Sequence, residues 1–323
     1  MKMMKNKHIF LKYYIKSKYQ GRKVSSDNIR TYIKEHIMIA NEKIQTAEEI
    51  NIYIRNLILS GKPFLAGRFG ATELSCVRTF DFEVSSKYDK VLSQMKMWSG
   101  FFPSEKEMGF NFKNLMMKSI PSADVMGIWM LPFEEYYLNK YGKTDLKTTY
   151  LFDLEPWSSP ENPWSAALKG KKVLVIHPFA ETIKFQYQNR VNLFPGTEIL
   201  PEFELKILKA VQTVAGTKDD RFDSWFDALD WMYQEAIKID FDVAIIGCGA
   251  YGFPLAAKLK QVGKQAIHLG GATQLLFGIK GKRWDEKTGT YEYVQKFFND
   301  AWVYPSDEDK PKAANKVEGG CYW

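Results

Sequence analysis

A glycine-rich turn, Gly247-Cys-Gly249-Ala-Tyr-Gly252, directly follows the apolar run 242–246 and precedes a segment of helical periodicity, 253–262. This order predicts a strand, a tight turn and a helix. In a Rossmann-like fold the first glycine permits the turn, the second lets the backbone approach a ligand, and the third allows close packing of the helix. The free N–H groups at the start of that helix favour a phosphate. We expect a phosphate or nucleotide to bind here; a purely structural turn is the alternative.

Apolar runs and helical patterns alternate along the rest of the chain. The run Lys172-Val-Leu-Val-Ile-His177 is typical of a buried parallel strand. Shorter strand candidates lie at 64–66, 125–130, 149–154 and 265–269, and helical spacing recurs at 28–44, 46–60, 104–120, 179–193 and 223–239. This alternation predicts the α/β class, with a Rossmann-like, doubly wound and mainly parallel sheet.

Three regions are expected along the chain: an N-terminal helical extension (1–60), a Rossmann-like domain (61–300) and a C-terminal tail (301–323) that docks on the domain. Two predicted capping boxes, Thr46-Ala-Glu-Glu49 and Ser104-Glu-Lys-Glu107, mark helix starts. The stretch 155–163 contains three prolines and predicts a loop, either an interdomain linker or part of a lid. The tail ends in Cys-Tyr-Trp323, and docking would remove these aromatic side chains from water.

Positive charge is concentrated at the N-terminus. Lysine and arginine number 45 against 38 acidic residues, and the first 23 residues hold basic side chains that meet no acid: Lys2, Lys5, Lys7, Lys12, Lys16, Lys18, Arg22 and Lys23. The rest of the chain is close to neutral, which argues against nucleic acid as a partner. The basic, aromatic N-terminus is either a peripheral contact with an anionic membrane surface or a solvated helix.

The cysteines and the hydropathy of the chain indicate its compartment. Cys76, Cys248 and Cys321 form no CxxC pair and show no metal-ligand spacing, so neither a zinc site nor a disulfide framework is indicated. No apolar run reaches the ~18 residues of a membrane span. These features predict a cytoplasmic protein, either free or peripheral at the inner face of the membrane.

Candidate catalytic and binding side chains follow two other predicted strands. Arg68, Gly70 and Glu73 come after the run 64–66. A guanidinium is suited to phosphate oxygens, and a carboxylate binds a divalent metal, accepts a proton or pairs with the arginine. His177 is the last residue of the predicted strand 172–177, and Glu181 follows shortly after it; an α/β enzyme carries catalytic side chains at such strand ends. General acid–base chemistry is the expectation for them, and a structural histidine is the alternative.

The last predicted strand ends in a second glycine pair. The dinucleotide version of the first motif places an acid about 20 residues later, where it binds the ribose hydroxyls. The sequence there, Ala266-Ile-His268-Leu-Gly-Gly271, has no acid, so we expect no NAD. Gly270 and Gly271 predict a further turn at the same edge of the sheet. Lys280 and Arg283 lie beyond it among glycines and aromatics; they neutralise a diphosphate or belong to a solvated charged face.

Two segments resemble a known family. Gly67-Arg-Phe-Gly-Ala-Thr-Glu73 resembles the "ARFGDGE" signature of the GT-D-fold glycosyltransferases of bacterial surface-glycan synthesis. The stretches 246–256 and 263–270 are similar to that family's glycine turn, helix and closing strand. The resemblance covers roughly residues 60–285, outside the N-terminal helices and the tail. It implies a GT-D-like fold for the region 61–300, with a nucleotide-sugar-binding site.

The resemblance implies transfer of a sugar from a nucleoside-diphosphate sugar to a glycan or lipid-linked acceptor in capsule or other surface polysaccharide biosynthesis. Combined with the residues above, it gives an expected catalytic set of Glu73, His177 and Glu181. The expected substrate-binding set is Arg68, Gly70, Gly247, Gly249, Tyr251, Gly252, Gly270, Gly271, Lys280 and Arg283.

The sequence departs from the family pattern at two positions. Ala71 stands where the family has the Asp of its Asp-x-Glu, and His268 stands where it has another Asp. Glu73 is then the one motif carboxylate left for Mn²⁺ or Mg²⁺, and a single carboxylate is a poor divalent site, so metal dependence is expected to be weak or absent. Two other functions stay open. The glycine turn supports an NAD(P)-dependent oxidoreductase or epimerase, and Ala71 supports a non-catalytic nucleotide-binding protein of a polysaccharide locus.

Overall fold

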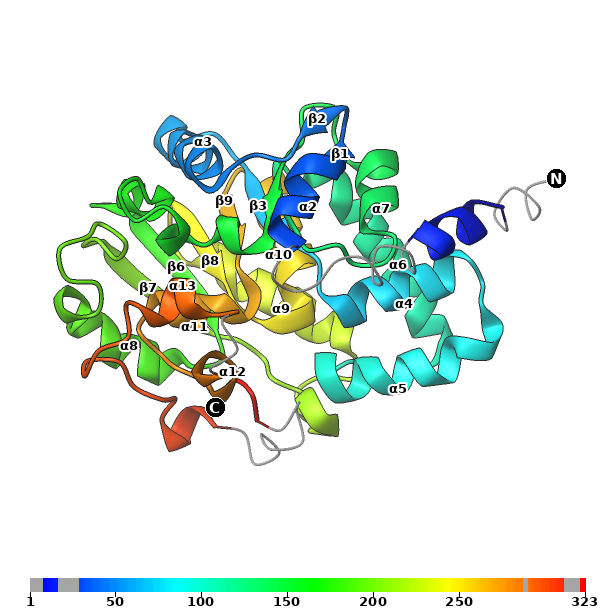
Figure 1. Cartoon of the computed structure of the whole chain (residues 1–323). Helices are drawn as coiled ribbons and strands as arrows, with labels where there is room; N and C mark the ends of the chain where they lie inside the picture. The colour runs from blue at the N-terminus through cyan, green and yellow to red at the C-terminus, as the bar shows by residue number, and fades with distance from the viewer. Residues whose placement is uncertain (1–7, 17–28, 287–289, 311–319) are drawn as a thin grey trace.

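A seven-stranded parallel sheet forms the centre of the molecule in the computed structural model, which describes residues 8–16, 29–286, 290–310 and 320–323 (Figure 1). The strand order is β5-β4-β3-β9-β8-β6-β7, and every neighbouring pair is parallel. The predicted α/β class with a doubly wound parallel sheet is therefore confirmed. The strands are β3 (Leu65–Arg68), β4 (Val125–Ile128), β5 (Lys147–Tyr150), β6 (Lys172–His177), β7 (Glu204–Lys209), β8 (Val243–Ile246) and β9 (Gln265–His268).

Two hydrophobic cores cover the two faces of this sheet. Alternate side chains of one strand enter different cores: Leu174 and Ile176 of β6 face one, and Val173 and Val175 face the other. The first core packs against α4 (Ala71–Asp81), α5 (Tyr88–Ser99), α6 (Lys106–Ser119), α7 (Glu134–Tyr141), α9 (Trp225–Lys238) and α10 (Gly252–Gln261). The second packs against α3 (Ala47–Ser60), α8 (Ala180–Gln188), α11 (Thr273–Leu276), α12 (Lys282–Asp285) and α13 (Glu292–Gln295).

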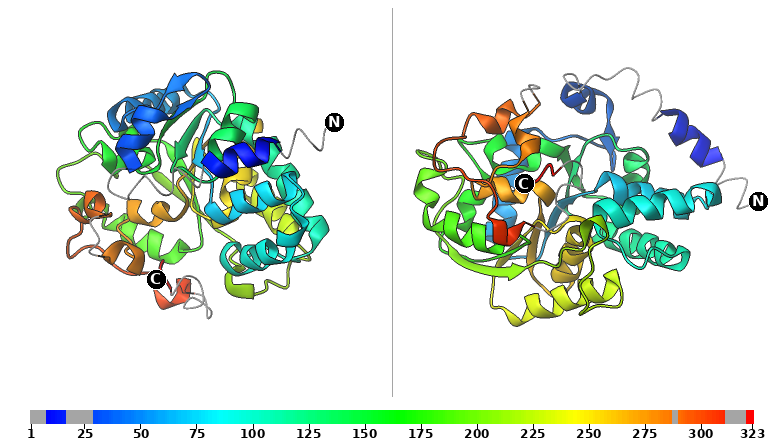
Figure 2. Two further views of the ribbon diagram at one scale, coloured as in Figure 1. Left: turned by 45° about the vertical axis from the view of Figure 1, so that its right-hand side comes forward. Right: turned by 90° about the horizontal axis from the view of Figure 1, so that it is seen from below.

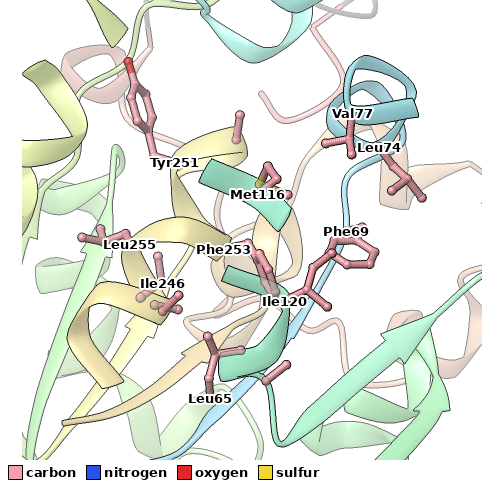
Figure 3. Packing of buried hydrophobic residues seen from close by; sticks show 14 of the residues in the cluster. Leu65, Phe69, Leu74, Val77, Met116, Ile120, Ile246, Tyr251, Phe253 and Leu255 are labelled. Atoms are coloured by element: carbon pink, nitrogen blue, oxygen red, sulfur yellow. The ribbon is translucent and has the colours of Figure 1, made fainter. Parts of the chain in front are cut away.

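One part of the first core lies at the carboxyl ends of β3 and β8. Figure 3 shows Phe69, which follows β3, beside Phe253 of α10, and their ring centroids lie 5.2 Å apart. Met116 and Ile120 approach the same place from the end of α6 (Figure 3). The segment after β3 and the helix after β8 are thus fixed against each other by apolar packing, which sets the relative position of the two predicted motifs.

The order of the strands creates a crevice at this edge. After β6 the chain moves outward to β7, whereas after β8 it moves inward to β9. In open parallel sheets, connections that leave in opposite directions open a gap beyond the carboxyl ends of the two strands, and ligands bind there. The fold therefore places a binding crevice where β6, β8 and β9 end.

Several predicted elements differ from those observed. The helix expected at 28–44 is shorter: α2 (Ile29–His36) is followed by a hairpin of β1 (Met38–Ile39) and β2 (Glu42–Lys43). Ala40 and Asn41 form its turn with φ of 54° and 61°, a backbone conformation that no helix contains. The apolar spacing simply continued through this turn, so periodicity alone could not detect it.

Of the two predicted capping boxes, one forms and the other does not. The one at Thr46 is confirmed, because its hydroxyl accepts from the Glu49 N–H and the Glu49 carboxylate accepts from the Thr46 N–H. The one at Ser104 is wrong. Its hydroxyl donates to the Phe101 carbonyl, and α6 begins at Lys106, after Glu105 at the N-cap, without a side-chain cap. The edge strand β7 was not predicted, since lysines interrupt its apolar residues and its side chains are half-exposed.

A helix over residues 8–16 packs through Phe10 and Tyr13 on Phe82, Phe133 and Tyr136. Its outer face leaves Leu11 and Ile15 exposed. Most of the N-terminal basic residues lie outside the described residues, so the membrane contact stays a prediction; these are Lys2, Lys5, Lys7, Lys18, Arg22 and Lys23. Among the helices that the structure describes, none has the length and apolarity needed to cross a bilayer.

The proline-containing stretch expected as linker or lid is held against α3 by one side chain. Asn51 is fully buried; its amide N–H groups donate to the Asp153 carbonyl and the Ser158 hydroxyl, and its oxygen accepts from the Trp164 N–H. Trp157 is buried in the same region. In this structure the stretch is therefore packed onto the body.

We expect Asn51→Ala to lower the free energy of unfolding by about 2–4 kcal/mol, because several buried polar groups would lose their partners. The matched control is Asn56→Ala on the exposed face of the same helix, where the change should stay within about 0.5 kcal/mol. Urea denaturation followed by circular dichroism measures both. Equal effects of the two substitutions would contradict this role of Asn51.

Candidate functional site

An open pocket of about 210 Å³ lies at the carboxyl ends of β3, β6, β8 and β9. Most of the residues proposed from the sequence line it, although they are spread over more than 200 positions of the chain. Those present are Arg68, Gly70, Glu73, His177, Gly247, Gly249, Tyr251, Gly270, Gly271 and Arg283. The strand-end rule therefore selected positions that the fold brings together.

Three proposed residues do not line the pocket. Glu181 is exposed on the first turn of α8 and pairs with Lys184 at 2.8 Å, because the buried face of that turn is taken by its apolar neighbours. Lys280 lies over the Tyr304 ring, 4.9 Å from its centroid. Gly252 is buried, and a Cβ there would lie 2.2 Å from the His268 ring. Glu181 and Lys280 therefore lie outside this pocket, and Gly252 contributes to packing.

Each glycine of the turn meets a different requirement. A Cβ at Gly247 would lie 2.5 Å from Cδ2 of His177 and 2.6 Å from Cβ of Thr273, so no side chain fits between the strand ends. Gly249 has φ of 58°, and nothing stands within 4 Å of where its Cβ would be. Its bare backbone faces the pocket just before α10, and this geometry allows a ligand to reach the main chain.

Arg68 is the clearest cation of the pocket. Its guanidinium lies over the Trp129 ring, 5.2 Å from the centroid, and its Nε donates to the Phe69 carbonyl at 3.2 Å. Within the part of the chain that the structure describes, this arginine forms no ion pair and its terminal nitrogens have no hydrogen-bond partner. An arginine in a pocket with its fork unpaired is suited to bind an anion.

Glu73 supplies a carboxylate to the same pocket from the first turn of α4. Its Oε1 accepts from the Ser99 hydroxyl at 2.8 Å, and a Cβ at Gly70 would lie 1.7 Å from its Oε2. Gly70 is therefore required by the folded-back carboxylate. Among the described residues, no three His, Cys, Asp or Glu side chains are grouped so that they could hold a metal ion.

Two buried histidines flank the glycine turn in opposite tautomers. The Phe179 N–H donates to Nδ1 of His177, which places the proton of that ring on Nε2. Nδ1 of His268 lies 3.2 Å from the Ile246 carbonyl and must carry the proton to donate there. Burial lowers the pKa of each to about 3; the Arg68 charge adds to the effect at His268, and Asp309 opposes it at His177.

The end of the chain closes one side of the pocket. Tyr322 and Trp323 line it, and Arg283 donates to the Tyr322 hydroxyl at 3.0 Å and lies over its ring. The Gln274 amide donates to the Tyr322 carbonyl, and a Cβ at Gly271 would lie 2.5 Å from the Tyr322 ring. Figures 1 and 2 show the C-terminus beside the segment that contains α12. These last residues contribute to the shape of the site.

Sequence reasoning missed several side chains that line the pocket. Trp129 directly follows β4, so the strand-end rule could have found it, but the predicted strand ran on to residue 130. Trp98, Ser99 and Thr213 come from α5 and from the segment after β7. No local pattern marks them, because long-range contacts bring them to the edge of the sheet: α5 packs on α4, and the Thr213 hydroxyl donates to the Gly100 carbonyl at 2.6 Å.

The site and sheet define a class of protein: a doubly wound α/β fold with a ligand pocket at its carboxyl edge. The chain matches no family model and no curated protein.

Two solved structures are similar to this chain. One is a "Selenomethionine substituted structure of domain of unknown function 1792" (13% identity, TM-score 0.45). The other is described by the words "the highly conserved domain of unknown function 1792 has a distinct glycosyltransferase fold" (13% identity, TM-score 0.40). Each comparison covers 88% of this chain and 96% of the other.

Acid should destabilise the wild type relative to His177→Asn. A histidine with a folded pKa of about 3 and an unfolded pKa near 6.5 binds its proton only in the unfolded state between these values, so its contribution is complete above pH 6.5 and falls as the pH is lowered. Because the asparagine oxygen still accepts from the Phe179 N–H, the variant loses mainly this proton linkage. We expect the stability difference between the two proteins to change by about 2 kcal/mol from pH 7 to pH 5.

The comparison with the variant is needed because burial raises the pKa of Glu134 and of Glu155 to about 8, and these groups titrate with the opposite sign. Their contribution cancels in the difference. Denaturant titrations at four pH values measure both proteins. A pH-independent difference for His177→Asn would contradict the burial of a neutral imidazole.

Proposed function

We propose that this protein is a glycosyltransferase that transfers a sugar from a nucleoside-diphosphate sugar to a glycan or lipid-linked acceptor. The observation that carries the proposal is the joining, in one pocket, of two glycine turns, an unpaired arginine and a carboxylate. The leaving group of such a reaction is a diphosphate, and its developing negative charge requires cations or aligned N–H groups. Surface polysaccharide synthesis in the cytoplasm is the setting that the sequence resemblance favours.

The donor is proposed to bind on the side of Arg68 and the glycine turns. The bare backbone at Gly249 begins the 3-10 turn Gly249–Tyr251 that leads into α10, a ten-residue helix whose first N–H groups attract an anion. Arg68 would approach the same anion from β3. His177 carries a proton on Nε2 and remains neutral, which suits it to donate a hydrogen bond and not to supply a charge.

The acceptor is proposed to bind on the side of Glu73. Ser99 holds this carboxylate, and the preceding residue, Trp98, leaves 43% of its surface exposed at the pocket. An exposed indole face stacks on the apolar face of a sugar ring. Glu73 is then placed to accept the proton of an attacking hydroxyl, which is general base catalysis. This separates the cationic side of the pocket from its carboxylate side.

Two other functions are compatible with the fold. A nicotinamide-dependent enzyme is opposed by the end of β9, where the buried His268 takes the place of the acid that binds the ribose. A non-catalytic nucleotide-binding protein would keep the pocket without turnover. Thermal shift of the purified chain with UDP-, GDP- and CMP-sugars and with NAD(P) distinguishes them. Stabilisation by NAD(P) alone would overturn the proposal, and nucleotide binding without donor consumption over a panel of acceptors would favour the non-catalytic function.

We expect Gly249→Asp to weaken binding of the nucleotide that stabilises the wild type by about tenfold or more, because the new carboxylate would face the phosphate. Aspartate tolerates a positive φ, so the fold should persist. Gly263→Asp is the matched control: this glycine also has positive φ, 86°, with open space around its Cβ position, but it lies beyond the far end of α10. Calorimetric affinities compare the two. Equal affinity of both variants would refute a phosphate site at Gly249.

We also propose that this site works with little or no help from a divalent metal. Glu73 is engaged by Ser99, and Ala71, two residues earlier in the motif, offers no second carboxylate. Nucleotide affinity should therefore change less than about twofold when EDTA replaces Mn²⁺. Ala71→Asp should create Mn²⁺-dependent binding, and Ala71→Asn is its uncharged control. Loss of wild-type binding in EDTA with full recovery in Mn²⁺ would contradict this proposal.

A further inference from the structure

Two side chains share one carbonyl beside the pocket. The Phe69 oxygen accepts from Nε of Arg68 at 3.2 Å and from Nε1 of Trp129 at 3.3 Å. The guanidinium also lies over the indole, 5.2 Å from its centroid. A cation–π contact together with a common acceptor fixes both the position and the direction of the guanidinium. Arg68 is thus held at its inner nitrogen, and its outer nitrogens remain for a ligand.

The glycine turn after β9 leaves space for this fork. A Cβ at Gly270 would lie 2.7 Å from Nη1 of Arg68, so any side chain there would displace the guanidinium. Gly270 also has φ of 64°, a conformation that favours glycine. The fork therefore lies between Trp129 on one side and the bare turn on the other, and both line the pocket.

Trp129 is itself held by a buried carboxyl group. Oε2 of Glu134 accepts from the Trp129 N–H at 3.0 Å and from the Leu131 N–H at 3.1 Å, and Glu134 is 2% exposed. The loop between them contains two non-glycine residues at positive φ, Met130 at 61° and Phe133 at 71°. Such conformations are unfavourable for residues that have a side chain and persist only where the surroundings impose them. Glu134 supplies two of the hydrogen bonds that do so.

We propose that Trp129 and Glu134 are positioning residues that hold Arg68 as a clamp for a diphosphate. Arg68 makes the contact with the anion; Trp129 orients the guanidinium, and Glu134 orients the backbone of Trp129. The identity of the anion rests on the proposed function, whereas the positioning rests on the contacts around Phe69. This series of contacts predicts that Trp129 and Glu134 affect the affinity for the anion only through Arg68.

A double-mutant cycle with inorganic pyrophosphate as the probe tests this dependence. Calorimetry on the full chain would compare the wild type, Arg68→Met, Trp129→Leu and the double variant. Arg68→Met should weaken pyrophosphate binding by about 10- to 100-fold, since charged hydrogen bonds contribute about 1.5–3 kcal/mol. Trp129→Leu should weaken it by about 3- to 10-fold. The double variant should bind no more weakly than Arg68→Met alone, which a merely structural role of Trp129 would not produce.

Two further variants extend the test to folding and to Glu134. Trp231→Leu is the matched control. The Arg221 guanidinium lies over the Trp231 ring, 4.6 Å from its centroid, and neither residue lines the pocket. The pyrophosphate affinity of this variant should equal that of the wild type. Glu134→Gln keeps an acceptor for the two N–H groups and should retain most of the affinity. Glu134→Leu should lose as much as Trp129→Leu. If Glu134→Leu does not fold, Glu134→Gln and the cycle still decide the outcome.

Additive losses in the double variant, or wild-type affinity in Trp129→Leu while Arg68→Met is impaired, would overturn the positioning role. Failure of the wild type to bind pyrophosphate would overturn the clamp itself. The proposed function fails separately: coupling between Trp129 and Arg68 together with no stabilisation by any nucleotide sugar would keep the clamp and reject the glycosyltransferase. Both hold if pyrophosphate binding is coupled and a nucleotide sugar competes for it.

Discussion

The close approach of strand ends at Gly247 is the constraint on which the site depends. His177 at the end of β6 and Thr273 after β9 leave no room for a side chain at this position. The carbonyl just before it, that of Ile246, accepts from the Thr273 hydroxyl and faces Nδ1 of His268. Three strands are thereby tied at one point. The pocket is the space above this junction, so its walls are as fixed as the sheet beneath them.

Charge in the pocket is arranged by burial and by pairing. The two histidines remain neutral because their rings are desolvated, and Arg68 makes protonation of His268 still less favourable. The cationic character of the pocket therefore comes from Arg68 and Arg283, and its anionic character comes from Glu73, which accepts a hydrogen bond from Ser99. In the proposed reaction, Arg68 would bind the anionic leaving group and Glu73 would activate the attacking hydroxyl.

Much of the edge of the sheet could be predicted from the sequence. Continuous apolar runs of strand length precede Arg68, His177 and Gly247, and the residues at the end of each run fall at the same edge because all the strands are parallel. Glu181 misled this rule, since one further turn of helix points its carboxylate into solvent. Trp129 was hidden because apolar residues continue past the end of β4, and the sequence does not show where pairing stops.

The sequence by itself indicated the buried strands that carry the site, the glycine turns and the capping box at Thr46, because each has a signature within a few residues; the edge strand β7 and the hairpin of β1 and β2 have none. Only the tertiary structure decided which side chains share the pocket. Ser99 reaches Glu73, and Trp129 reaches Arg68, through the packing of separate elements on the sheet. It also decided the protonation of His177 and His268, since a pKa responds to the burial of the ring and not to its neighbours in sequence. The sequence therefore indicated where along the chain the site residues lie, but not which of them contact one another, because those contacts depend on packing between distant segments.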